Sequence, residues 1–180
     1  MLVGAGQLSP FEEEVRIQMT KKVFNGIDYI LRLIISVLLL LMTAVIFYQV
    51  ILRYVFHGSN VWAEEFARYA FIWVVMLGSA CAVRRYKHIR IDFLIDRMSS
   101  KVRYVVEFVT YLIMIAMLLL LTYYGFAIAN QTMGQLSSGI HISKGFMYTS
   151  IPVGSLLMIV FIVEILMNDF NLKKGSTNKV

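Results

Sequence analysis

The residue types most able to do chemistry gather in one short segment, Asn60 to Tyr69, where an apolar stretch begins. Glu64, Glu65 and Arg68 stand within two helical turns of one another there. One interpretation is an ordinary helix start, in which Asn60 caps the helix, the acids oppose the positive end of the dipole, and Arg68 pairs with them. This interpretation explains the acids better than Arg68, because a charge more than a turn inside a membrane helix is costly.

The second interpretation is an ion-paired contact with another helix or another subunit. At about 100° per residue, one stripe of this helix runs from charged to small side chains, namely Glu64, Arg68, Ile72, Val75, Ser79 and Ala82. Small side chains allow the close approach of a neighbouring helix within a membrane. We assign to this contact Trp62, Glu64, Glu65, Arg68, Tyr69, Gly78, Ser79 and Ala82.

Other kinds of chemistry lack a pattern in this sequence. A membrane haem needs paired histidines in facing helices, whereas His57, His88 and His141 fall in connecting segments. A single cysteine, Cys81, leaves no intrachain disulfide or CxxC site, and the segment 174–176 lacks the glycine frame of a P-loop. We therefore expect no enzyme activity and no bound cofactor or metal.

The composition requires a membrane to position these residues. The chain of 180 residues is 59% hydrophobic and 16% charged, with a mean hydropathy of +0.72. Soluble domains are about half apolar and about a quarter charged. The net charge of +6 is explained better by basic residues that flank membrane helices than by nucleic-acid binding. We expect one membrane domain over residues 1–180.

Four stretches are long and apolar enough to cross a bilayer as helices, at about 30–53, 62–84, 103–129 and 146–167. The sequence thus predicts an all-α integral membrane protein. Between the second and third helices, Ile91, Leu94, Ile95 and Met98 follow the spacing of one helix face. Their basic neighbours favour a short amphipathic helix over about 87–99 that lies on the membrane surface. Arg84, Arg85, Lys87 and Arg90 are the expected lipid contacts.

The basic residues also predict the orientation. Of the 17 lysines and arginines, four precede the first helix or begin it, seven lie between the second and third helices, and three follow the fourth. These fourteen fall on one side, and Arg53, Arg68 and Lys144 fall on the other. Because positive loops stay inside, both termini are expected in the cytoplasm.

A resemblance to a known family rests on two motifs. The first consists of Trp62-Ala63-Glu64-Glu65, Arg68-Tyr69, Trp73, Leu77-Gly78, Ala80, Arg84, His88-Ile89 and Ile91-Asp92, and the second of Ile142 to Tyr148 and Ile151-Pro152-Val153-Gly154. Together they resemble the small permease (DctQ-like) subunit of tripartite ATP-independent periplasmic (TRAP) transporters over most of 60–154. The termini match that family only in general character.

The resemblance implies a three-part system in a bacterial inner membrane. A periplasmic binding protein delivers an organic acid anion, of the sialic acid or C4-dicarboxylate type, to a large multi-span membrane subunit that couples transport to sodium. The small subunit supports the large one and helps dock the binding protein, so the substrate and sodium sites lie elsewhere. The residues we expect at a periplasmic docking surface are Asn60, Gln135, Ser138, His141 and Lys144.

Two other classes of function remain open on the sequence alone. A self-contained carrier or channel, assembled from copies of this chain, would favour an ionisable group near the membrane midplane. None of the four predicted helices carries one. A membrane enzyme or electron-transfer anchor would need a site of the kinds excluded above. Pro152 could interrupt the fourth helix, and we interpret it as a packing kink, since no second such helix suggests a transport repeat.

Overall fold

The computed structural model describes residues 10–58, 60–85 and 100–177, and the regular elements in these ranges are helices. They are α1 (Pro10–Val55), α2 (Val61–Arg85), α4 (Ser100–Thr132), α5 (Lys144–Tyr148) and α6 (Ser150–Thr177). The amphipathic helix expected over 87–99 lies outside the described residues.

Four helical spans are long and apolar enough to cross a membrane, at Lys21–Val55, Val61–Arg85, Phe108–Thr132 and Lys144–Met167. This confirms the all-α architecture with four membrane helices. The fourth span is made of α5 and α6, which meet at Thr149. Pro152 has no backbone N–H and its ring disfavours a regular helical turn before it, which explains an interruption at this place.

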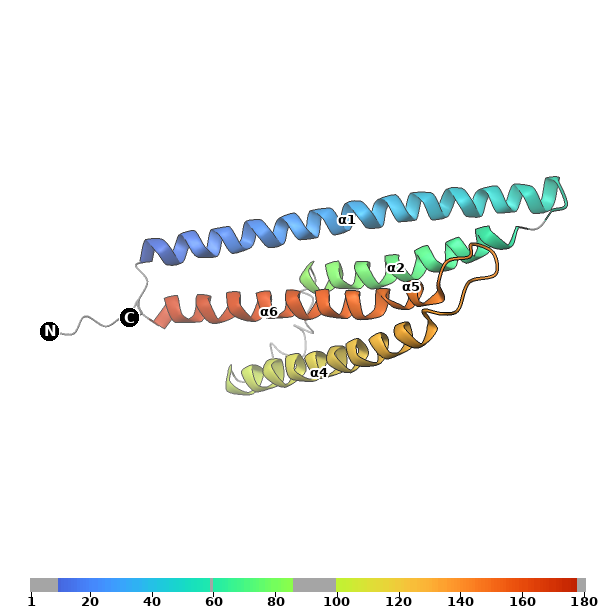
Figure 1. Cartoon of the computed structure of the whole chain (residues 1–180). Helices are drawn as coiled ribbons and strands as arrows, with labels where there is room; N and C mark the ends of the chain where they lie inside the picture. The colour runs from blue at the N-terminus through green and yellow to red at the C-terminus, as the bar shows by residue number, and fades with distance from the viewer. Residues whose placement is uncertain (1–9, 59, 86–99, 178–180) are drawn as a thin grey trace.

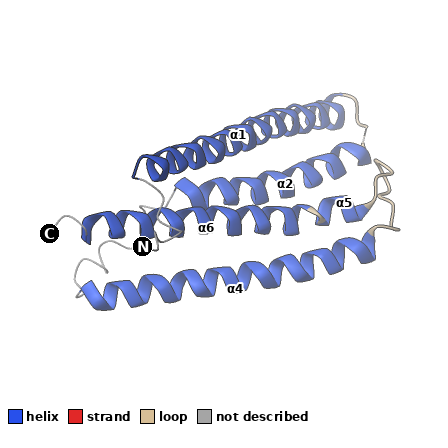
Figure 2. Ribbon diagram, turned by 60° about the vertical axis from the view of Figure 1, so that its left-hand side comes forward, coloured by secondary structure: helices blue, strands red, loops and turns tan. Residues whose placement is uncertain are grey.

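The helices lie side by side in the spatial order α1, α2, α6, α4 (Figures 1 and 2). The two central helices, α2 and α6, therefore each pack against a helix on both sides. The first helix α1 packs mainly on α2, and α4 packs on α6 and α5. The arrangement resembles a layer more than a closed four-helix bundle. Large areas of apolar surface consequently remain uncovered by this chain.

The best packed region lies where all four long helices contribute to one cluster. Its buried members are Leu31, Leu77, Ala80, Cys81, Leu118, Met158, Phe161 and Ile162. Phe161 of α6 is fully buried, and its ring lies 6.3 Å from that of Phe24 on α1. Lipid tails are as apolar as these side chains, so close packing and polar contacts must hold the helices together.

Two glycines bring α6 against its neighbours on both sides. A Cβ atom added at Gly125 of α4 would lie 2.8 Å from the Pro152 ring, and one added at Gly154 of α6 would lie 2.8 Å from Cβ of Met76 on α2. Real Cβ atoms do not approach other atoms so closely. The α4–α6 and α2–α6 spacings therefore depend on the missing side chains.

We expect Gly125→Ala to lower the thermal stability of the detergent-solubilised chain, because the added methyl group must push Pro152 and α6 away. Overpacking of this kind costs about 1–3 kcal/mol. Gly26→Ala on α1 is the matched control, since no atom lies within 4 Å of its added Cβ. Circular dichroism melting of both variants checks the prediction, and equal melting temperatures would contradict it.

Candidate subunit-contact site

The carboxylate of Glu65, near the N-terminal end of α2, binds a loop of its own chain. Oε1 accepts the backbone N–H of Ser138 at 3.1 Å, and Oε2 accepts those of Gly139 at 2.7 Å and Ile140 at 3.0 Å. The Ser137 hydroxyl also donates to Oε2. A run of successive N–H groups around one carboxylate is a typical anion-binding loop geometry. Glu65 thus fixes the loop between α4 and α5 on α2.

The same loop is shaped by its own backbone. The N–H of Ser137 donates to the carbonyl of Ile142 at 2.9 Å, and His141 has the left-handed φ of 58° that closes the turn. A Cβ atom at Gly139 would lie 2.8 Å from both N and Cα of Trp62. Only glycine lets the loop approach the start of α2 this closely.

Glu64 and Arg68 form a separate ion pair on the uncovered face of α2. Nη2 of Arg68 lies 2.8 Å from Oε1 of Glu64, and the two side chains are 60% and 65% exposed. A guanidinium carries five N–H donors. In the described part of the chain this pair is the one contact of Arg68, so most of its donors have no partner here.

The rest of the predicted stripe is open to different degrees. Val75 is exposed, Ser79 and Ala82 are partly buried, and nothing lies within 4 Å of a Cβ added at Gly78. Of the other residues assigned to this contact, Tyr69 is buried inside the fold, and Trp62 lies with its ring 6.3 Å from that of Tyr48 on α1. The structure therefore divides the residues assigned to this contact. Glu65 and Tyr69 point into the protein. One face of α2 carries Glu64, Arg68, Gly78, Ser79 and Ala82.

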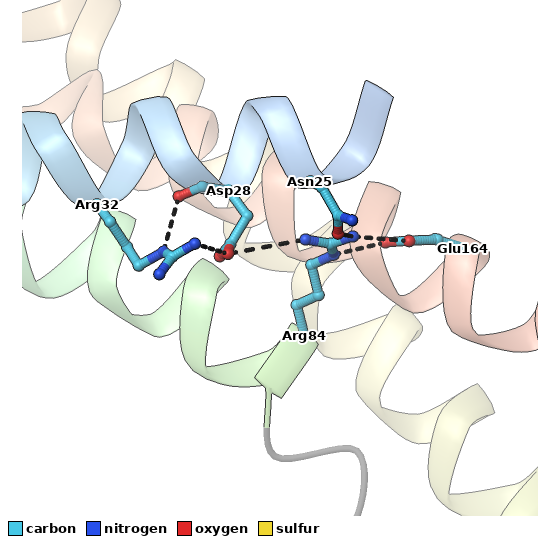
Figure 3. A network of polar contacts seen from close by, with 5 residues as sticks. All are labelled: Asn25, Asp28, Arg32, Arg84 and Glu164. Carbon is cyan, nitrogen blue, oxygen red and sulfur yellow. Dashed lines mark hydrogen bonds and ion pairs between the residues drawn. The ribbon is translucent and has the colours of Figure 1, made fainter. Parts of the chain in front are cut away.

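The C-terminal end of α2 carries a second polar centre that joins three helices (Figure 3). Arg84 donates from Nε to Oε2 of Glu164 at 2.9 Å and from Nη2 to Oε1 at 3.1 Å, which makes a bidentate pair between α2 and α6. Nη2 also donates to Oδ1 of Asn25 on α1 at 2.8 Å. The Arg84 side chain is 14% exposed and that of Glu164 is 7% exposed.

Asp28 of α1 completes this inner network. Its Oδ2 lies 2.7 Å from Nη2 of Arg32 and 3.7 Å from Nη1 of Arg84, and the residue is 5% exposed. Two guanidinium groups and two carboxylates thus balance in charge. The Arg84 guanidinium also lies 5.6 Å from the centre of the Phe161 ring. We call Asn25, Asp28, Arg32, Arg84 and Glu164 the inner network.

The inner network differs from the sequence-based expectation. Arg84 was expected at lipid headgroups together with Arg85, but its side chain turns into the protein, whereas Arg85 is exposed. Lys87 and Arg90 lie outside the described residues. Sequence reasoning did not assign Asp28 or Glu164 to a site. The sequence did contain a sign of this site, because Asp28 and Glu164 are acids near the ends of apolar helices that the predicted four-helix topology brings to the same side as Arg84.

The residues expected at a periplasmic docking surface lie in the segment before α2 and in the connection between α4 and α5. Gln135, Ser138, His141 and Lys144 are exposed in or beside the loop that Glu65 holds, and Asn60 precedes α2. The structure thus brings Ser138 into contact with Glu65, and a docking role for this loop stays a prediction. Within the described ranges no three histidine, cysteine or acidic side chains gather in a way that could hold a metal.

Comparison with known protein families gives a match over residues 42–172 to the family described as tripartite ATP-independent periplasmic transporters, DctQ component. The sialic acid TRAP transporter permease protein SiaT of Haemophilus influenzae is 30% identical over 129 residues, which are 72% of this chain and 21% of SiaT. The sialic acid TRAP transporter small permease protein SiaQ of Vibrio cholerae is 28% identical over 164 residues, which are 89% of this chain and 91% of SiaQ.

A third relative has a different named substrate. The C4-dicarboxylate TRAP transporter small permease protein DctQ of Vibrio cholerae is 37% identical over 62 residues, which are 34% of this chain and 27% of that protein. The chain therefore spans about a fifth of SiaT and nearly the whole of SiaQ.

We expect Glu65→Gln to loosen the loop between α4 and α5, because a glutamine carbonyl cannot replace a carboxylate that accepts four hydrogen bonds. The charge-assisted bonds from the loop to the carboxylate are then lost or weakened, so the loop opens more often. Hydrogen–deuterium exchange over residues 136–142 should then become faster. Glu64→Gln is the matched control, since Glu64 contacts Arg68 and not the loop. Equal exchange in the two variants would show that Glu65 does not hold the loop.

For the inner network we expect Arg84→Met to destabilise the chain more than the double change Arg84→Met with Glu164→Met. The single change leaves a buried carboxylate without its partner, at a cost of about 3–5 kcal/mol, whereas the double change removes both charges. Asp28 keeps Arg32 in either case. A double-mutant cycle of melting temperatures measures this coupling. Additive effects of the two substitutions would contradict a direct Arg84–Glu164 interaction.

Proposed function

Because the chain belongs to the DctQ component family of TRAP transporters, we propose that it is the accessory subunit of an importer that takes up an organic acid anion. The family is a component of a transporter rather than an enzyme, and the chain is a multi-pass membrane protein. Transport itself would take place in a large multi-span membrane subunit coupled to sodium. This chain would support that subunit as a fixed framework.

One observation carries the proposal of a framework rather than a carrier. Each carboxylate whose side chain the structure describes is bound to groups of this same chain, and these carboxylates are Asp28, Glu64, Glu65 and Glu164. A proton-coupled carrier favours an ionisable group near the membrane midplane that can exchange its partner during transport. In this chain the acids hold helices and a loop in place instead.

The substrate class follows from the relatives. Two carry sialic acid in their names and a third carries a C4-dicarboxylate, so an organic acid anion is the shared chemistry. Both substrates would be selected outside this chain, and we assign no substrate, sodium or cofactor site to it. A periplasmic binding protein would supply the anion.

The orientation in the inner membrane is part of the same proposal. With both termini in the cytoplasm, the loop held by Glu65 faces the periplasm and the inner network lies on the cytoplasmic side. A fixed loop that exposes Gln135, Ser138 and His141 suits the docking of a soluble binding protein. Arg85 is exposed at the inner end of α2, where it suits contact with anionic lipids.

The experiment is uptake of radiolabelled sialic acid or C4-dicarboxylate into vesicles that contain this chain with its large subunit and binding protein, driven by a sodium gradient. We expect uptake from the three-part system and only background uptake when either membrane subunit is left out. Uptake by this chain alone would overturn the proposal and identify a self-contained carrier. The double change Glu64→Gln and Arg68→Gln should lower the rate without altering which anion is preferred.

A further inference from the structure

The charges at the C-terminal end of α2 do not balance. Within the inner network, the carboxylates of Asp28 and Glu164 meet the guanidinium groups of Arg32 and Arg84, so the network itself is neutral. Arg85 follows Arg84 directly, is exposed, and takes part in no ion pair among the described residues. One guanidinium group therefore stands beside the inner network without a counter-charge.

Arg32 of α1 keeps free hydrogen-bond donors although it is paired with Asp28. Its Nε donates to the Asp28 carbonyl at 3.2 Å, and its Nη2 lies 2.7 Å from the carboxylate oxygen Oδ2. A guanidinium carries five N–H donors, and those on Nη1 have no partner within the described ranges. The side chain is 43% exposed and lies on the side of Asp28 away from Arg84 (Figure 3). Its free donors point to an acceptor from outside the chain.

Arg32 and Arg85 approach the same part of the contact between α1 and α2. Cys81 is buried in this contact one helical turn before Arg85, and its thiol lies within electrostatic range of Asp28, Arg32 and Arg85. Lys21 stands on the same face of α1 as Asp28, two turns earlier, and is also exposed. The edge of the α1–α2 contact therefore has a positive field to which both helices contribute.

The membrane places Arg32 at the level of the lipid headgroups. The uncharged stretch of α1 between Arg32 and Arg53 is about 30 Å long at the rise of an α-helix, which equals the thickness of the hydrocarbon core. Tyr29 and Leu33, which flank Arg32 on α1, are 64% and 54% exposed. Exposed apolar surface thus adjoins the cations on the hydrocarbon side. A ligand that matches both features has an anionic head and an apolar body.

We propose that Arg32 and Arg85 bind the phosphate group of one anionic phospholipid, whose acyl chains lie on the exposed face of α1 beside Tyr29 and Leu33. Guanidinium groups bind phosphate through paired N–H···O bonds, and Lys21 adds to the positive field. A zwitterionic lipid also has a phosphate, but its ammonium group would meet the same cations. An anionic headgroup such as that of phosphatidylglycerol is therefore favoured. The site is built from this chain alone and does not require the large subunit.

The first test uses the unaltered chain. The detergent-solubilised protein is mixed with phosphatidylglycerol, with phosphatidylethanolamine or with inorganic phosphate, and native mass spectrometry measures what stays bound. We expect one phosphatidylglycerol to be retained about fivefold more than phosphatidylethanolamine, and no retention of inorganic phosphate. Equal retention of the two lipids, or displacement of phosphatidylglycerol by inorganic phosphate alone, overturns the inference.

The second test compares arginines at the two ends of the membrane. Arg85→Gln should lower the preference for phosphatidylglycerol about fivefold, whereas Arg85→Lys keeps the charge and should keep most of the preference. The matched control is Arg53→Gln, because Arg53 is exposed near the other end of α1 and should change the preference less than about twofold. Arg32 is left unaltered, since its removal would also take a partner from Asp28.

An unchanged preference in Arg85→Gln would overturn the inference and leave Arg85 with the negative end of the α2 dipole as its only interaction. The same fall in Arg53→Gln as in Arg85→Gln would also overturn it, because the lipid would then respond to net charge alone. Neither result bears on the proposed function, since uptake is measured separately in the three-part system.

Discussion

The contact on which the fold depends is the guanidinium of Arg84 held between α1, α2 and α6. A bilayer offers no gain for bringing apolar helices together, since lipid tails solvate leucine as well as another leucine does. A nearly buried arginine, by contrast, is very costly to leave in hydrocarbon without partners. Glu164 meets it with both carboxylate oxygens and Asp28 approaches from α1. Without these partners the charge would be exposed to lipid. The ion pairs therefore stabilise the association of the three helices at this end of α2.

At the opposite end of α2, Glu65 also joins separate segments of the chain, but its partners are backbone N–H groups. It holds a polar loop, whose backbone N–H groups would otherwise need water, against the start of the helix. The two polar centres are thus at the two ends of α2, and the glycine contacts of α6 lie between them. The α2 helix is therefore held by polar contacts at both ends. This is the physical sense in which we propose that the chain is a framework.

The sequence predicted the parts of the structure that depend on hydropathy. Length and apolarity were sufficient for four membrane helices, and the helical repeat was sufficient to group Glu64, Arg68 and Ala82 on one face. The sequence did not predict which group each acidic side chain binds. Glu64 and Glu65 are adjacent and of one type, yet one pairs along the helix and the other binds a loop more than seventy residues away. Arg84 looked like one of several lipid-facing basic residues, because only the packing of α1 and α6 brings Asp28 and Glu164 to it.

The spatial order of the helices has a consequence for biosynthesis. The helices leave the ribosome in the order α1, α2, α4, α6, but in the layer α6 lies between α2 and α4. When α4 enters the membrane, the helix α6 against which it packs has not yet been synthesised. The α4 face that later contacts α6 is therefore exposed to lipid until α6 is inserted. Arg84 enters even earlier, long before Glu164. During that interval Asp28 on α1 is already present, and it gives the arginine a first counter-ion until its bidentate partner is synthesised.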